Sequence, residues 1–279
     1  MAERYVAFLD TLGFRAQVAK QTQKEAEAMI RGIAATVREE WARCQKENEG
    51  IMTALLVSDS VIAYTEDASD RALASLLQFS LALCKSTFWK NGILLRGAIS
   101  KGNFMEVRSE DNQNLREELM VGQAYISAYT LESKVKSSSI LMEKEVRNDI
   151  ITHFGTTKYI VDATEKEGIY ALRWADIAYL QNWGVMEHFV KLANASGWKP
   201  HYYNTLYSFL RKSPGEARRR DVFRSILKLA SMNEAGESDA RSWHKQDEFI
   251  RNAFAPEVDS NFQKMMLTFL RQAALEQKE

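Results

Sequence analysis

The sequence is poor in the residues that build metal clusters and disulfide scaffolds. Its 279 residues include only two cysteines and four histidines. Cys44 and Cys84 do not form a CxxC pair, and the histidines lie far apart in the chain without metal-ligand spacing. This pattern argues against a zinc site made of cysteine and histidine. We expect both cysteines to be reduced packing residues.

The chain also lacks net charge and long apolar runs. Lys and Arg number 37, as do Asp and Glu, so no overall field would draw the chain to nucleic acid or anionic lipid, and any phosphate binding must be local. The longest apolar stretches, 75–84 and 125–129, are too short to span a bilayer, and the first ten residues lack the apolar core of a secretory signal. We therefore expect a cytoplasmic protein with neither a nucleic-acid nor a membrane partner.

What the sequence does contain is a mixture of strand and helix patterns over its first 172 residues. Apolar runs predict strands at 5–9, 52–57, 61–65, 93–99, 103–107 and 139–142. Helical periodicity predicts helices at 24–48, 67–88 and 122–133. Lys101 and Gly102 are expected to turn the chain between two strands. This order predicts an α+β domain at 1–172, and the helical period that dominates afterwards predicts a helical region at 173–279.

Two aspartates stand where strand patterns end. Asp10 closes the first apolar run just before a turn at Gly13, and Asp59 lies at the tip of a predicted hairpin. Two carboxylates on neighbouring strands can hold two cations about 3.5–4 Å apart, as phosphoryl transfer requires. A helix that starts after the turn would favour phosphate through its N–H groups. Either aspartate alone is readily explained as an ordinary turn residue. The interpretation of the pair as a metal site therefore depends on the motifs around it.

Four segments resemble the class III nucleotidyl cyclases. Residues 8–14 (FLDTLGF) resemble the F-x-D-x-x-G-F opening of that family, and 57–60 (VSDS) resemble its metal-binding hairpin. Residues 95–102 (LRGAISKG) are similar to its R-x-G-I-x-x-G segment, and 122–132 (GQAYISAYTLE) align without gaps with its G-D-T-V-N-x-A-S-R-M-E helix. The order and spacing make the set more specific than any one motif. The resemblance implies a ferredoxin-like βαββαβ sheet with flanking helices.

The resemblance also implies roles for individual residues. Asp10 and Asp59 would bind two Mn²⁺ or Mg²⁺ ions, with the Thr11 carbonyl completing one shell. The turn and helix start would hold the β- and γ-phosphates through Gly13, Phe14 and Arg15. The ribose 3′-oxygen would attack the α-phosphorus, and pyrophosphate would leave. Because the family works as head-to-tail dimers, a homodimer with active sites at the interface is implied.

Four positions depart from the adenylate cyclase pattern. The Lys and Asp that read adenine in that family correspond to Leu55 and Leu119, which offer no hydrogen bonds. The Asn and Arg that contact ribose and the transition state correspond to Ile126 and Thr130. Adenine recognition in that style is therefore not expected, and the usual transition-state donor is missing from its place.

The form G-x-A-x-x-x-A-Y-x-L-E at 122–132 resembles the pyrimidine cyclases of bacterial Pycsar anti-phage defence. That resemblance implies UTP or CTP as the substrate, and cyclic UMP or cyclic CMP acting on a separate effector protein; uracil and cytosine both stay open. Arg96 is the first candidate for the missing donor and Lys101 the second, although a surface salt bridge explains Arg96 equally well. Candidate base-contacting residues are Thr53, Leu55 and Leu119.

Two other functions compete with this interpretation. A catalytically silent, nucleotide-binding dimeric module acting through its helical tail is the main alternative, and the presence of both aspartates favours the enzyme over it. A diguanylate-type cyclase is disfavoured because residues 57–61 lack the Gly-Gly-acid-Glu-Phe hairpin.

Overall fold

A computed structural model describes residues 2–47, 50–107, 119–164, 166–174, 201, 204 and 205. The chain divides into two compact units: Met1–Val135 with Ser139–Trp174, and Lys136–Ser138 with Ala175–Glu279. Nearly all of the helical region predicted at 173–279 lies outside the described residues, so that prediction stays a prediction. None of the helices in the described part of the chain is both long and apolar enough to cross a membrane.

The described strands form one sheet of eight in the first unit. They are β1 (Ala2–Thr11), β2 (Met52–Val57), β3 (Ser60–Thr65), β4 (Leu95–Val107), β5 (Leu119–Val121), β6 (Ile140–Glu143), β7 (Val161–Ala163) and β8 (Ile169–Leu172). The order β2-β3-β1-β4, all antiparallel, is that of a ferredoxin-like βαββαβ unit, and β6, β8 and β7 extend the sheet beyond β4. The predicted α+β fold with flanking helices is confirmed.

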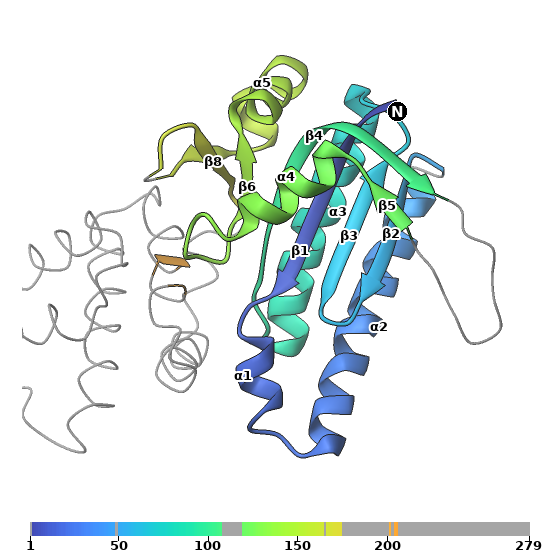
Figure 1. Cartoon of the computed structure of the whole chain (residues 1–279), viewed down its shortest axis with the longest axis vertical. Helices are drawn as coiled ribbons and strands as arrows, with labels where there is room; N and C mark the ends of the chain where they lie inside the picture. The colour runs from blue at the N-terminus through green and yellow to red at the C-terminus, as the bar shows by residue number, and fades with distance from the viewer. Residues whose placement is uncertain are drawn as a thin grey trace, which may run out of the picture. The chain divides into compact units, whose positions relative to one another are not determined.

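Helices cover both faces of this sheet (Figure 1). The described helices are α1 (Phe14–Val18), which lies beyond the end of β1, α2 (Gln23–Glu47), α3 (Asp70–Asn91), α4 (Gln123–Glu132) and α5 (Lys144–Lys158). α2 and α3 pack together against one face, and α4 crosses the other over β1 and β4. Capping hydrogen bonds define where two of these helices begin. Thr22 and Glu25 form a reciprocal capping box before α2, and the Ser69 hydroxyl accepts a hydrogen bond from the Ala72 N–H at 3.2 Å before α3.

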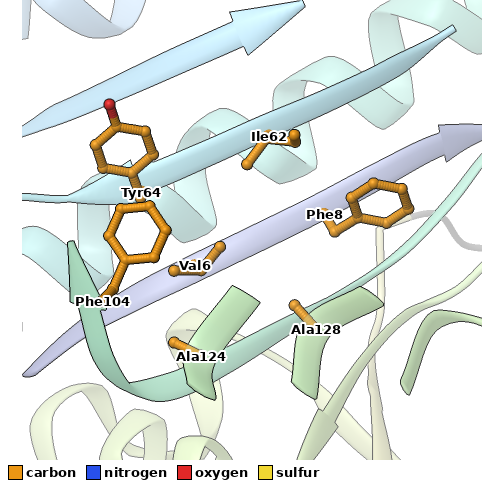
Figure 2. Packing of buried hydrophobic residues seen from close by; sticks show 7 residues of the cluster. All are labelled: Val6, Phe8, Ile62, Tyr64, Phe104, Ala124 and Ala128. Atoms are coloured by element: carbon orange, nitrogen blue, oxygen red, sulfur yellow. The ribbon is translucent and has the colours of Figure 1, made fainter. Parts of the chain in front are cut away.

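The apolar core beneath α4 follows from strand alternation. Side chains two residues apart on a strand share a face, so Val6 and Phe8 of β1 point to the same side as Ile62 and Tyr64 of β3. Figure 2 shows these four with Phe104 and the α4 residues Ala124 and Ala128. The two alanines are one helical turn apart and their small side chains let α4 lie close to the sheet, which fixes the direction in which its C-terminal end points.

One prediction about the sheet is wrong. Lys101 and Gly102 do not turn the chain; they lie inside β4, opposite Tyr5 and Arg4 of β1. β1 is ten residues long, so it offers β4 hydrogen-bonding partners well past the expected turn, and the ladder outweighs the turn preference of glycine. The strand that returns along β4 is β5, which pairs with its last residues.

Gly97 lies at a point where β4 closely approaches β1. A Cβ atom at this position would lie 2.3 Å from the Phe8 carbonyl oxygen and 2.5 Å from Cδ2 of Leu9. Real Cβ atoms do not come this close to backbone oxygen, so the glycine of the R-x-G segment is required by packing. Arg96, its neighbour, is thereby placed directly opposite Asp10.

We predict that Gly97→Ala lowers the free energy of unfolding by at least about 1–3 kcal/mol, because the added methyl group must displace β1 backbone. Urea denaturation measures the loss. Gly32→Ala in α2 is the matched control: within 4 Å its added Cβ meets only Oδ1 and Cγ of the flexible Asn91 side chain, at 3.1 and 3.8 Å. Equal losses in the two variants would contradict this explanation of Gly97.

Candidate functional site

Asp10 and Asp59 are brought together where β1 meets the tip of the β2–β3 hairpin. Asp10 pairs with Ser60 of β3, and the Ser60 hydroxyl donates to Asp10 Oδ1 at 2.9 Å. The N–H and hydroxyl of Thr11 donate to the backbone carbonyl of Asp59 at 3.2 and 3.0 Å. Two aspartates 49 positions apart in the sequence therefore occupy one end of two neighbouring strands.

In the described part of the chain, the hydrogen bonds that hold the hairpin tip to Thr11 use the backbone carbonyl of Asp59 and not its carboxylate. Among the described residues, Ser58 is the one non-glycine residue with a positive φ, at 57°, a conformation that costs free energy and persists only where its surroundings enforce it. The two Thr11 bonds to the Asp59 carbonyl supply that restraint. The Asp59 carboxylate is thus available for a ligand, and its replacement should leave the turn intact.

The electrostatics of the pair favour an additional cation. Burial raises the pKa of the Asp10 carboxyl above its ordinary value of 3.8, the negative charge of Asp59 raises it further, and Ser60 and Arg96 oppose the change. Two carboxylates that repel each other present the hard oxygen ligands that Mg²⁺ and Mn²⁺ prefer. Within the described ranges no group of three or more His, Cys, Asp or Glu is placed to hold a metal ion. One or two carboxylates suit ions that are shared with substrate phosphates.

Arg96 lies between Asp10 and a residue that the sequence analysis did not single out, Glu132. Its Nη2 is 3.5 Å from Asp10 Oδ2, and its Nε forms an ion pair with Glu132 Oε1. The exposed fractions of the three side chains are 18% for Arg96, 21% for Asp10 and 7% for Glu132, so this is a largely buried network and not a surface salt bridge. Glu132 is the final letter of the segment 122–132, and its match to the motif's glutamate was the available signal.

The structure places Lys101 away from Asp10 and Asp59. It is five residues from Arg96 along β4, so it points to the opposite face of the sheet and lies about 16 Å further along the strand. Its Nζ is 3.1 Å from Asp149 of α5 and within 3.7 Å of Glu3 and Glu145. Lys101 therefore neutralises a separate acidic cluster.

The predicted phosphate-binding residues follow Asp10 directly. Gly13 has a left-handed backbone (φ 74°, ψ 16°), which allows β1 to turn at once into α1. Phe14 and Arg15 are the first residues of that short helix, where N–H groups have no acceptor within the helix. Their role in phosphate binding stays a prediction.

The predicted base-contacting residues are distributed over two strands. Thr53 and Leu55 of β2 pair with Tyr64 and Ile62, and Leu55 packs against the cluster beneath α4. Leu119 is 47% exposed at the start of β5. The structure places none of the three beside the aspartate pair in the sheet register.

No family model and no curated protein matches the sequence. Solved structures that the chain resembles include the guanylate cyclase domain of RhGC from Catenaria anguillulae in complex with GTP, at 14% identity and a TM-score of 0.48, covering 62% of this chain and 96% of that one. The adenylyl cyclase CyaB from P. aeruginosa is similar at 13% identity and a TM-score of 0.46, with 61% and 93% covered. Identities this low leave function to be argued from the residues of this chain.

We predict that Asp10→Asn is more stable than the wild type near neutral pH in the presence of a chelator. Because the pKa of Asp10 is raised in the folded state, that state holds its proton more tightly than the unfolded chain, and stability falls as the pH rises above 3.8. Asparagine removes this loss, so the difference between the two proteins should shrink as the pH is lowered towards 3.8.

Urea unfolding over a pH series measures this difference. Glu27→Gln, which removes a carboxylate that is 57% exposed on α2, serves as the control and should change stability by less than about 0.5 kcal/mol. Destabilisation of Asp10→Asn at neutral pH would show instead that the charged carboxylate stabilises the fold.

Proposed function

We propose that the chain is a nucleotidyl cyclase that converts UTP or CTP into the 3′,5′-cyclic monophosphate and pyrophosphate. The observation that carries the proposal is the pairing of Asp10 with the Asp59 hairpin, in which two segments resembling the metal-binding motifs of class III cyclases meet. The raised pKa of Asp10, caused by burial and then by the negative charge of Asp59, supports a site that gains from binding cations.

In this proposal Asp10, Asp59 and the Thr11 carbonyl hold two divalent ions, Mg²⁺ or Mn²⁺. Such ions, when bound, would lower the pKa of the ribose 3′-hydroxyl and stabilise charge on the phosphates. The 3′-oxygen attacks the α-phosphorus, its proton is lost, and the bond to the β-phosphate oxygen breaks. The amides of Phe14 and Arg15 receive the leaving pyrophosphate. Thr130 occupies the position of the family's usual arginine. Arg96, which lies beside Asp10, would supply the positive charge instead.

The pyrimidine preference rests on the residues that replace the purine readers. Leu55 and Leu119 can neither donate to nor accept from a base edge, and leucine is a poor partner for the extra polar atoms of a purine. The segment 122–132, which forms α4, has the pattern of the Pycsar pyrimidine cyclases. We therefore assign the product, cyclic UMP or cyclic CMP, to signalling in anti-phage defence through a separate effector protein.

A homodimer with active sites at its interface is part of the proposal. Large apolar side chains are exposed on α4 and on the β4–β5 pair: Met105, Val107, Leu119, Val121, Ile126 and Tyr129. Exposure reaches 55% for Ile126 and 58% for Tyr129. In the proposed dimer a second copy would cover these apolar side chains, as is typical where such side chains form one surface.

The absence of the usual transition-state residues favours one alternative. Ile126 and Thr130 stand in their places, and neither can donate charge to a phosphate. A catalytically silent dimeric module that binds nucleotide and acts through the region after residue 173 would need no such donor. Tight nucleotide binding with no turnover of any of the four triphosphates would support this alternative.

We predict that the purified chain with Mn²⁺ converts UTP or CTP into a cyclic monophosphate and pyrophosphate, and that Asp59→Asn lowers the rate at least about 100-fold. Chromatography with mass spectrometry identifies the products. Asp70→Asn, at the exposed start of α3, is the control and should keep its rate. Wild-type turnover that survives in Asp59→Asn would rule out the proposed site.

We further predict that Ile126→Asp converts the dimer to a monomer, because an aspartate in the apolar interface would be buried without a partner. Sedimentation velocity measures the mass, and activity should fall with the loss of the dimer. Gln123→Asp, at an exposed polar position in the first turn of the same helix, should remain dimeric. A dimeric Ile126→Asp variant would show that this surface is not the interface.

A further inference from the structure

The network around Arg96 suggests a role for Glu132 that rests on the cation site proposed above. We propose that Glu132 is a positioning residue that holds the Arg96 guanidinium away from the Asp10 carboxylate and so keeps Asp10 open to divalent cations. Glu132 itself would not touch the cations or the substrate.

The contacts of Arg96 are unequal. Arg96 and Asp10 are cross-strand partners with side chains on one face, a placement that normally allows a direct ion pair. A full arginine–carboxylate pair has N–O distances of about 2.7–2.9 Å and often two parallel bonds. Here Nη2 stays 3.5 Å from Asp10 Oδ2, whereas Nε is paired with Glu132 Oε1. Of these two carboxylates, Glu132 engages the guanidinium more directly.

Glu132 is well fixed for this task. It is the last residue of α4 and only 6% exposed. Its neighbour Leu131 is 4% exposed and packs with Ala98 and Leu141 of the sheet, and Ala124 and Ala128 anchor the preceding turns. A buried carboxylate is tolerated only with a partner, and Arg96 is that partner. Since neither the helix nor the sheet can move freely, the position of Glu132 determines where the guanidinium lies.

Without Glu132, Arg96 and a cation would compete for the same oxygen atoms. The guanidinium carries five N–H donors and its charge is permanent, so an arginine released from Glu132 can form a closer ion pair with Asp10. Binding of cations would then require that pair to be broken first. An ion pair that serves only the fold would, in contrast, affect stability without changing cation affinity once the protein is folded.

The test measures Mn²⁺ binding to the full chain without nucleotide, by calorimetry and by the electron paramagnetic resonance signal of free Mn²⁺. We expect Glu132→Gln to bind Mn²⁺ about 10- to 100-fold more weakly, as is typical when a residue behind a metal ligand is lost. Arg96→Met/Glu132→Gln should regain at least the wild-type affinity, because the competing cation is gone. Glu143→Gln, an exposed glutamate at the end of β6, should bind as the wild type does.

The double variant also keeps the test informative if Glu132→Gln alone fails to fold. Removing both members of a buried ion pair costs much less than removing one, so the double variant should fold even where Glu132→Gln does not. Wild-type affinity in folded Glu132→Gln, or equally weak binding in the double variant, would overturn the proposal. Mn²⁺ binding that is lost in Asp59→Asn but unchanged in Glu132→Gln would leave the cyclase site standing and remove only this inference. A wild type that binds no Mn²⁺ without nucleotide would remove this inference, whereas the proposed function is decided separately by turnover of UTP or CTP.

Discussion

The candidate site depends on the hydrogen bonds that tie the β2–β3 hairpin to the end of β1. Two carboxylates do not approach each other unaided, because their charges repel and burial removes the water that would screen them. Thr11 overcomes this by donating both its N–H and its hydroxyl to the Asp59 carbonyl, and Ser60 adds a bond to Asp10 itself. All three bonds would survive without the carboxylate of Asp59. Hydrogen bonds of the surrounding residues therefore offset the repulsion between the two carboxylates. This arrangement is expected where a residue is kept for function and not for stability.

The helix α4 connects this site to the remainder of the fold. One side of it, with Ala124 and Ala128, lies on the sheet, and its last residue, Glu132, engages Arg96. Its outer side exposes Ile126 and Tyr129, which the proposed dimer would bury. In the proposed dimer, the outer side of α4 would contact the second copy while its last residue, Glu132, pairs with Arg96 beside Asp10. The proposed interface and the aspartate pair would then be connected through this one helix.

Much of this arrangement is visible in the sequence because it is local. The alternation of Val6 and Phe8, the cap at Ser69 and the turn chemistry around Asp59 are each readable within a few residues, and they predict β1, α3 and the β2–β3 hairpin correctly. The short strands β5, β7 and β8 were not predicted. Long-range effects were not readable. Gly102 looks like a turn residue, but the length of β1 keeps it in a strand. Lys101 looks like a phosphate ligand, but strand parity turns it to the other face. Glu132 looks like an exposed helix residue until the position of Arg96 is known.

The same reasoning constrains how the base can be selected. Uracil and cytosine have nearly the same shape and differ at positions 3 and 4, where donor and acceptor are exchanged. Apolar side chains therefore cannot distinguish them, and only a hydrogen-bonding group can. Leu55 is committed to the cluster beneath α4, and Leu119 is an exposed apolar side chain. Thr53 is the polar side chain that shares the β2 face with Leu55, opposite Tyr64. If the chain converts UTP or CTP as proposed and binds the base against this strand, discrimination falls to the hydroxyl of Thr53 or to backbone groups. A substitution that alters only the leucines should then change affinity for both pyrimidines together.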